Sequence, residues 1–138
     1  MTIEKCFIYA RNAAEYSDFT KIHVGCVAIY KGKIIGEGYN SNKTHPVQER
    51  YNRYRNARNY DTSSLLPKLH AEIMCLNSIK DKNINWKKVK LYIYRIRNDR
   101  PFGIARPCPA CMNALKDLGI CDIYYTTDAG YAHEKISY

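Results

Sequence analysis

The stretch ARPCPACMN, residues 105–113, sets two cysteines three positions apart at the start of a predicted helix. Cys108 stands between two prolines, and Pro109 falls in the first helical turn, where proline is tolerated. A Cys-x-x-Cys pair can be a redox couple, half of a structural zinc site, half of a catalytic zinc site, or a coincidence. The rest of the sequence has to distinguish these alternatives.

The segments around this helix alternate between strand and helix patterns, with no repeat and no linker, which indicates one domain over residues 1–138. Residues 41–68 are polar and basic, and we expect a long loop there with a short helix over 48–58. Crossover helices between strands make at least part of the sheet parallel, so we expect an α/β fold. The predicted elements are a helix over 2–17, a β-hairpin over 23–40, a helix over 69–80, a strand over 89–96, a helix over 108–119, a strand over 121–127 and an edge strand over 131–136.

Length and composition are typical of a soluble globular domain: 138 residues, 46% hydrophobic and 25% charged. Glu4, Lys5 and Arg11 interrupt the apolar residues of the amino terminus, and no stretch approaches roughly 18 apolar residues. We therefore expect a cytoplasmic protein with no membrane partner, whose six cysteines are thiols or metal ligands. The four cysteines outside the pair fall in apolar patterns and are predicted to be buried: Cys6, Cys26, Cys75 and Cys121.

The formal net charge of +9 is concentrated in two segments. Residues 43–58 hold five basic side chains and one acidic, and residues 95–106 hold four basic and one acidic. Each segment alone is typical of a solvated loop, but two basic segments beside one pocket suit an anionic partner such as a phosphate. Tyrosine alternates with arginine over residues 50–60, a pattern that suits either stacking on nucleic-acid bases or a lid with its tyrosines packed inward.

The sequence His70-Ala71-Glu72 opens one predicted helix, and Cys108 and Cys111 open the next, so both sets follow loops at helix amino termini. In a parallel sheet these termini meet at the carboxyl ends of the strands, which brings His70, Cys108 and Cys111 together. Two thiolates and one imidazole form a three-ligand zinc site whose fourth tetrahedral position stays open for water. Glu72 points away from the ligand direction of His70, and it is the candidate base that moves a proton from water to a leaving amine.

The motifs and their order resemble those of the cytidine/deoxycytidylate deaminase superfamily over nearly the full chain. They are a hairpin that ends in GYNSN (residues 38–42), then HAE (70–72), then PCPAC (107–111). H-x-E followed by P-C-x-x-C is the signature of zinc deaminases that act on cytosine or adenine. The resemblance implies a three-layer α/β/α cytidine-deaminase-like fold with a mixed sheet of about five strands, and hydrolytic deamination that depends on Zn²⁺.

The resemblance also implies roles for individual residues. The three ligands would hold zinc, and Glu72 would be the catalytic proton shuttle. Asn40 would contact the sugar, and the backbone amides of Ala71 and Cys108 would bind the base carbonyl and the attacking oxygen. No motif assigns the remaining substrate contacts, for which the candidates are Arg106 beside the metal-binding turn for a phosphate, and Tyr125 or Tyr131 for stacking on the base.

The function we expect is a zinc-dependent hydrolytic deaminase that converts a cytosine-bearing nucleotide, similar to dCMP, to its uracil form with release of ammonia. One alternative is a nucleic-acid-editing deaminase that acts on single-stranded DNA or RNA or on tRNA. The net charge favours this alternative, but editing deaminases append helices for which the sequence after Thr127 has no room. A further alternative is a non-catalytic zinc module that binds nucleic acid, against which Glu72 argues, since a structural zinc site needs no base. Relatives assemble as dimers or larger, so we also expect a homo-oligomer.

Overall fold

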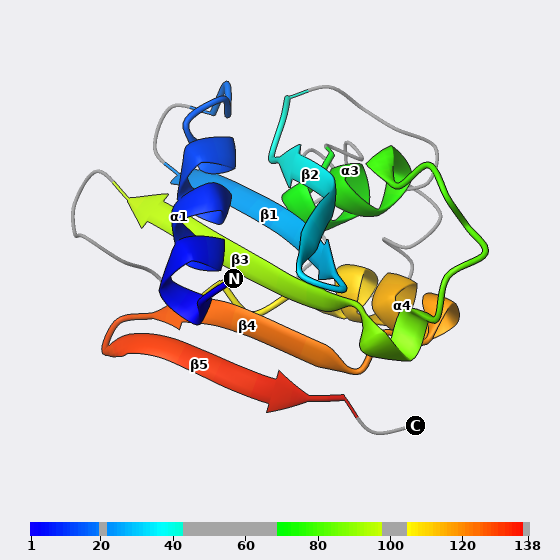
Figure 1. The fold of residues 1–138 in the computed structure, drawn as a ribbon. Coiled ribbons are helices and arrows are strands. Elements are labelled where there is room, and N and C mark those ends of the chain that lie inside the picture. The colour runs from blue at the N-terminus through cyan, green and yellow to red at the C-terminus, as the bar shows by residue number, and fades with distance from the viewer. Residues whose placement is uncertain (20–21, 43–68, 98–104, 137–138) are drawn as a thin grey trace.

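The computed structural model describes residues 1–19, 22–42, 69–97 and 105–136, which form one sheet with helices on both faces (Figure 1). The strands lie in the order β2-β1-β3-β4-β5. The elements are α1 (Ile3–Ala14), β1 (Ile22–Tyr30), β2 (Lys33–Tyr39), α3 (Ala71–Ser78), the 3-10 helix η3 (Trp86–Lys88), β3 (Lys90–Arg97), α4 (Pro109–Leu118), β4 (Asp122–Thr127) and β5 (Gly130–Lys135).

The strand directions explain where a site can form. Strand β1 pairs antiparallel with both β2 and β3, while β3 pairs parallel with β4. Strands β2, β3 and β4 therefore run the same way, and their carboxyl ends lie at one edge of the sheet. Helix α3 follows β2 and helix α4 follows β3, so both helices begin at that edge. Strand β5 closes the sheet as an antiparallel partner of β4, which completes the predicted mixed sheet.

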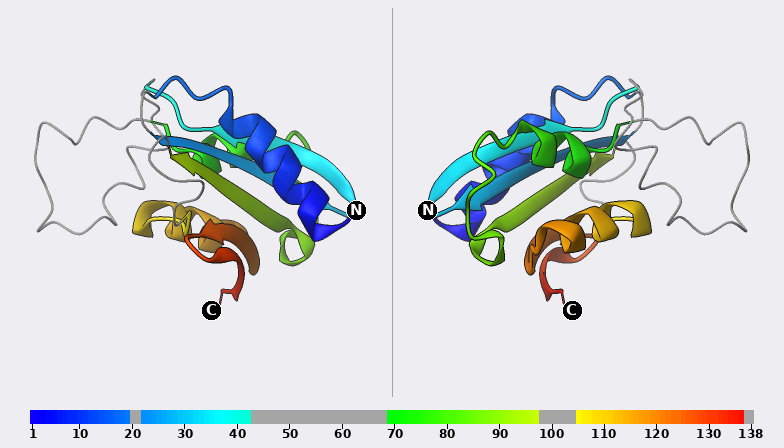
Figure 2. Two further views of the ribbon diagram at one scale, coloured as in Figure 1. Left: turned by 90° about the vertical axis from the view of Figure 1, so that its left-hand side faces the viewer. Right: turned by 90° about the vertical axis from the view of Figure 1, so that its right-hand side faces the viewer.

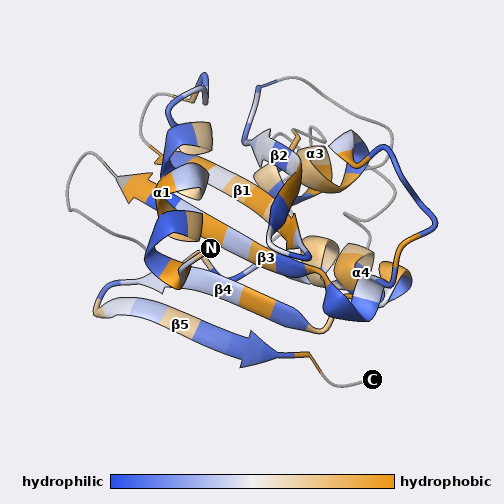
Figure 3. Cartoon of the chain, viewed as in Figure 1, coloured by the Kyte–Doolittle hydropathy of each residue, from blue (hydrophilic) through white to orange (hydrophobic). Residues whose placement is uncertain are grey.

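The helices form two outer layers, as the predicted three-layer arrangement requires (Figure 2). Helix α1 lies on one face, where Phe7 and Ala10 pack against Val27 and Tyr92 of the sheet. Helices α3 and α4 lie on the other face, over a larger apolar core. Apolar residues are frequent along β1 and β3, whereas β5 is largely hydrophilic (Figure 3).

Two glycines allow helices to lie directly on strands. A Cβ atom at Gly38 of β2 would collide with the backbone of Ala71 and Cys75 in α3. A Cβ at Gly25 of β1 would collide in the same way with the backbone of Ala10 in α1. Glycine at position 38 therefore sets how closely the first turn of α3 approaches the sheet.

The turns follow the sequence expectations. The β1–β2 hairpin turns at Lys31 and Gly32, both with positive φ, which is the backbone that a tight two-residue hairpin requires. Helix α4 ends at Leu118, and its C-cap residue Gly119 has a left-handed conformation in which its N–H bonds to the carbonyl groups of Leu115 and Lys116.

Some predicted details need correction. The first helix ends at Ala14 and not near residue 17, because the amides of Tyr16 and Ser17 bond to carbonyls three residues back in a turn. Cys6, Cys26 and Cys75 are buried thiols as predicted, but Cys121 is half-buried because it lies in the connection between α4 and β4. The predicted short helix over 48–58 lies outside the described residues. In the part of the chain that the structure describes, no helix is long and apolar enough to cross a membrane.

Candidate metal centre and proton-transfer site

His70 is held at the carboxyl end of β2 by backbone hydrogen bonds on both sides. It is the N-cap residue of α3, and its carbonyl accepts a hydrogen bond from the Met74 amide at 3.1 Å. The residue before it, Leu69, accepts a hydrogen bond from the Ser41 amide at 2.9 Å. The end of β2 and the start of α3 are thus tied together, although 28 positions separate Ser41 from Leu69 in the sequence.

The two cysteines are placed by the start of α4. Cys108 is the N-cap residue, Pro109 occupies the first helical position, and Cys111 follows within the first turn. The Met112 amide donates to the Cys108 carbonyl at 2.9 Å, which closes that turn. The segment leading into it is fixed to β4, because the Ala105 amide donates to the Thr126 carbonyl at 2.9 Å.

Three ligand atoms meet where α3 and α4 begin. His70 Nδ1 lies 3.6 Å from Cys108 Sγ and 3.4 Å from Cys111 Sγ, and the three ligand atoms all lie within 4.8 Å of one another. Zn–S bonds of about 2.3 Å and Zn–N bonds of about 2.0 Å in a tetrahedron separate nitrogen from sulfur by about 3.5 Å. The ligand types and both nitrogen–sulfur distances therefore fit one zinc ion. Among the described residues, no other group of His, Cys, Asp and Glu side chains could hold a metal.

The two thiols differ in their readiness to bind a metal. Hydrogen bonds from Cys111 and His70 favour the Cys108 thiolate and lower the pKa of Cys108 to about 4. Cys111 donates the hydrogen bond to Cys108 and is buried, and both effects raise its pKa. The lowered pKa of Cys108 favours its thiolate, whereas Cys111 must lose a proton when a metal ion binds.

Glu72 lies in the first turn of α3, beside the ligands but outside the ligand set. Its side chain is buried, with 6% of the residue exposed. Burial raises the pKa of the Glu72 carboxyl, although the neighbouring His70 acts in the opposite direction. A bound divalent ion would add positive charge here and favour the ionised carboxylate. A buried carboxyl group with a raised pKa beside a metal centre suits a group that both takes up and releases a proton.

Asn40 and Ala71, two predicted substrate contacts, both lie at this edge of the sheet. Ala71 is the buried first residue of α3, where a backbone N–H has no partner within the helix. The Asn40 side chain accepts a hydrogen bond from the Val24 amide at 2.9 Å and donates one to the Ile22 carbonyl at 3.0 Å. Asn40 thus binds the start of β1, and its contact with a sugar stays a prediction.

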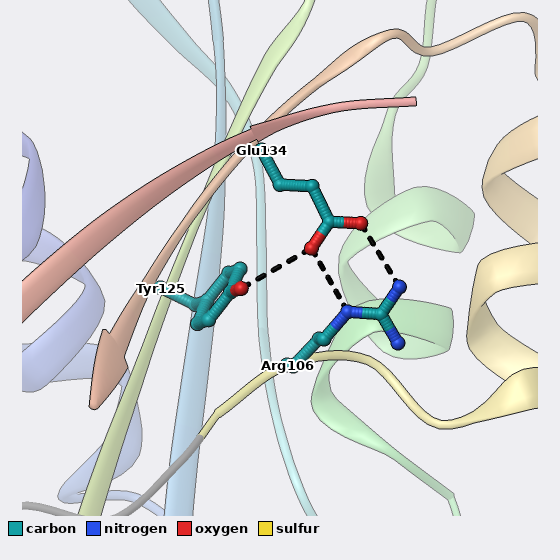
Figure 4. A network of polar contacts seen from close by, with 3 residues as sticks. All are labelled: Arg106, Tyr125 and Glu134. Atoms are coloured by element: carbon teal, nitrogen blue, oxygen red, sulfur yellow. Dashed lines mark hydrogen bonds and ion pairs between the residues drawn. The ribbon is translucent and has the colours of Figure 1, made fainter. Parts of the chain in front are cut away.

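Arg106 forms an ion pair with Glu134 that the sequence did not reveal (Figure 4). Nε and Nη2 of Arg106 donate to the two carboxylate oxygens of Glu134, each at 2.9 Å. The Tyr125 hydroxyl donates to the same carboxylate at 3.1 Å. The predicted contacts of Arg106 with a phosphate and of Tyr125 with a base stay predictions, but both side chains are engaged by one glutamate of β5.

Tyr131 does not belong to this site, which corrects its nomination as a base-stacking residue. Its ring stacks on Phe7 of α1, with centroids 3.9 Å apart and planes 7° apart. Phe7 belongs to the core on the α1 face, whereas the zinc ligands lie on the α3 and α4 face. The basic segment over 43–58 and the arginine–tyrosine stretch over 50–60 lie outside the described residues.

Comparison with known proteins identifies a family. Residues 1–127 match the family described as "Cytidine and deoxycytidylate deaminase zinc-binding region". No curated protein sequence is significantly similar to the chain.

Solved structures are similar over nearly the whole chain. A cytidine deaminase from Burkholderia pseudomallei is 18% identical with a TM-score of 0.66, over 98% of this chain and 93% of that one. A dCMP deaminase from the cyanophage S-TIM5 in its apo form is also 18% identical, with a TM-score of 0.60, over 92% of this chain and 86% of that one. The same phage enzyme in complex with dCMP and dUMP is 21% identical with a TM-score of 0.59. At these identities the likeness shows the fold.

Proposed function

The chain belongs to the cytidine and deoxycytidylate deaminase family of zinc-dependent hydrolytic enzymes, and we propose that its substrate is a cytosine-bearing nucleotide of the dCMP type. The observation that carries the proposal is the convergence of His70, Cys108 and Cys111 beside a buried acid, Glu72. The reaction consumes one water: a C–O bond forms at C4 of cytosine, the C4–N bond breaks, and ammonia leaves.

His70, Cys108 and Cys111 would hold the zinc ion that this reaction needs. Zinc in such a site acts as a Lewis acid that makes water a better nucleophile near neutral pH. Because two thiolates and a neutral imidazole nearly cancel a double positive charge, a separate base is needed to take the proton from water. Glu72 is the acid–base residue within reach of the ligands, and its buried carboxylate would accept that proton.

The same carboxyl group would complete the reaction. After the C–O bond has formed, protonated Glu72 would hand its proton to the exocyclic amine, which departs as ammonia. The amide N–H of Ala71, at the first position of α3, would donate a hydrogen bond to the base carbonyl. The amide of Cys108, the N-cap residue of α4, would donate to the oxygen at C4.

A phosphate on the substrate is supported by positive charge near the metal-binding turn. Arg106 lies two residues before Cys108, and its side chain is about half exposed, at 49%. A guanidinium in such a position binds phosphate with two parallel hydrogen bonds. One structure with the same fold, at a TM-score of 0.59, is a dCMP deaminase solved with dCMP and dUMP.

A free cytosine nucleoside is the second candidate substrate, and one observation favours it. The guanidinium of Arg106 already binds the Glu134 carboxylate through two hydrogen bonds, which cancels its charge. A site in which Arg106 is neutralised in this way would accept a substrate without a phosphate. The alternative of polynucleotide editing has no such support among the described residues, and membership of an enzyme family argues against a non-catalytic zinc module.

The direct test is turnover of four substrates by the purified, zinc-loaded protein: dCMP, CMP, deoxycytidine and cytidine. Ammonia release and formation of the uracil product are followed for each substrate. We expect the highest kcat/KM with a monophosphate. Faster turnover of the nucleosides would favour the second candidate, and no turnover of any of the four would refute the proposal.

A further inference from the structure

The pairing of Arg106 with Glu134 uses the edge of the guanidinium group through which arginine binds phosphate. Nε and Nη2 each donate to one carboxylate oxygen, at 2.9 Å, in a parallel two-bond arrangement (Figure 4). A phosphate presents two oxygens to arginine in the same geometry. We propose that Glu134 determines substrate specificity, because its carboxylate competes with the 5′-phosphate of the substrate for Arg106 and weakens the preference for nucleotides over nucleosides. The proposal rests on the proposed function, since it concerns the phosphate of that substrate.

The fold brings the carboxylate to this position from the last strand of the sheet. Glu134 of β5 pairs in register with Ile123 of β4, and Tyr125 lies two residues further along β4. Ile123 belongs to the core under α3 and α4, and Tyr125 packs against that core. Glu134 therefore contacts Arg106 on the same face of the sheet as the three metal ligands, near the amino end of β4.

The ion pair between Arg106 and Glu134 is exposed enough for a phosphate to replace the carboxylate. Its side chains are 49% and 31% exposed, so water and a ligand can reach them. Exposed ion pairs contribute little to stability, and a dianionic phosphate can exchange with the carboxylate. The hydrogen bonds from Arg106 lower the pKa of Glu134, so the carboxylate remains charged at neutral pH. The Tyr125 hydroxyl, 3.1 Å from the same carboxylate, adds a third hydrogen bond that holds it in place.

The critical variant is Glu134→Gln, which removes the competing charge and keeps the size of the side chain. We expect the ratio of kcat/KM for dCMP to kcat/KM for deoxycytidine to rise about twofold to fivefold, the size expected of one exposed charge pair. The gain should come from a lower KM for dCMP, with the nucleoside constants unchanged. In the double variant Arg106→Gln/Glu134→Gln the gain should disappear, because the phosphate then has no guanidinium to bind.

A matched control removes the carboxylate of Asp122, which lies in the same hairpin. Asp122 pairs with His133 at 2.9 Å, and the His133 ring stacks on Tyr124, which packs against the core on the α1 face. Asp122→Asn therefore changes the net charge by the same amount but on the opposite face of the sheet. We expect the substrate ratio to stay at the wild-type value in this variant, and circular dichroism shows that each variant is folded.

A binding measurement tests the role of Glu134 separately from the proposed function. In a Glu72→Gln background, which is expected to bind without turnover, calorimetry gives the Kd of dCMP and of deoxycytidine with and without Glu134→Gln. Tighter dCMP binding in the Glu134 variant supports the competition. An unchanged or lower preference for dCMP would overturn the role of Glu134 and leave the proposed function intact. No binding and no turnover of either compound would refute the proposed function itself.

Discussion

His70 Nδ1 lies 3.4 Å from Cys111 Sγ, although 41 positions separate the two residues in the sequence. The contact exists because β2 and β3 run in the same direction, so that α3 and α4 begin at one edge of the sheet. Each helix contributes its first turn, and Cys108 lies 3.6 Å from the same nitrogen. The position of the metal site is therefore a consequence of strand direction.

Loss of one ligand should abolish tight zinc binding. Cys111→Ala removes a buried sulfur whose position fits tetrahedral coordination, and we expect the zinc content per chain to fall to a small fraction of the wild-type value. Turnover should fall with it and return neither on dialysis nor on addition of zinc. Elemental analysis of the purified protein measures the content. Cys6→Ala, which removes a buried thiol from α1 on the opposite face, should keep both zinc and activity.

The close approach of α3 to β2 should be sensitive to a single methyl group. In Gly38→Ala the new Cβ would collide with the backbone of Ala71 and Cys75, so the helix must move away from the strand. We expect a destabilisation of about 1–3 kcal/mol, as for other overpacked sites, and weaker zinc binding because His70 moves with the helix. Urea unfolding and zinc competition with a chelator measure the two effects. Glu37→Ala, at the exposed neighbouring position, should change neither, and a Gly38→Ala protein with wild-type stability would contradict the packing argument.

Asn40 should matter to stability whether or not it touches the substrate. Asn40→Ala leaves the Val24 amide and the Ile22 carbonyl without the partners they have now. Both groups are partly buried, so each lost hydrogen bond should cost about 1 kcal/mol and the free energy of unfolding should drop measurably. Asn42→Ala, in the same segment but exposed, should cost less. If Asn40→Ala instead raised KM with no change in unfolding, the residue would act on the substrate alone.

The ion pair between Arg106 and Glu134 should make the stability depend on pH at the acidic end. Hydrogen bonds from Arg106 lower the pKa of Glu134 in the folded chain. A carboxyl with a lowered folded pKa stabilises the fold above its unfolded pKa of about 4.3, and this contribution is lost as the pH falls through the folded value. Because the pair is partly exposed, the contribution is at most about 1 kcal/mol.

Glu134→Gln should therefore unfold at a lower urea concentration than the wild type at pH 7, and the two midpoints should converge as the pH falls through the lowered pKa of Glu134. Urea titrations of the wild type and of Glu134→Gln at several pH values, from pH 7 into the acidic range, measure the difference between the midpoints. If the difference in urea midpoint grew as the pH fell, the ion pair would not lower the pKa of Glu134, and the prediction would be contradicted. Asp122→Asn serves as the reference for loss of a carboxylate on the other face.

The parts of the site that could be predicted from the sequence are those in which chemistry restricts the choice of residue. Zinc accepts few ligand types, and ligands at helix starts must follow strands, so His70, Cys108 and Cys111 could be placed before the structure was known. The order of helices and strands followed from apolar periodicity and from turn residues such as Gly32 and Gly119.

The parts that could not be predicted depend on contacts between distant residues of unremarkable type. Glu134 lies beside Lys135 in an edge strand with no motif around it, and its partner Arg106 is 28 positions away. The register of β5 on β4 and the hydrogen bond from the Ala105 amide to the Thr126 carbonyl bring the two together, and no local pattern specifies either contact. The prediction that Tyr131 stacks on the base is wrong for a related reason. The face of the sheet on which Tyr131 lies is fixed by its pairing with Thr126 and by its stacking on Phe7, and neither contact follows from the local sequence.

The measurement that tests the central claim most directly is the zinc content and the deamination rate of Glu72→Gln beside the wild type. Glu72 lies beside the metal ligands without belonging to them, so its amide variant should keep the wild-type zinc content. An amide cannot take up and release the proton, so ammonia release from dCMP should fall by a factor of about 10² or more. A variant that keeps its zinc and most of its activity would contradict the assignment of Glu72 as the proton shuttle.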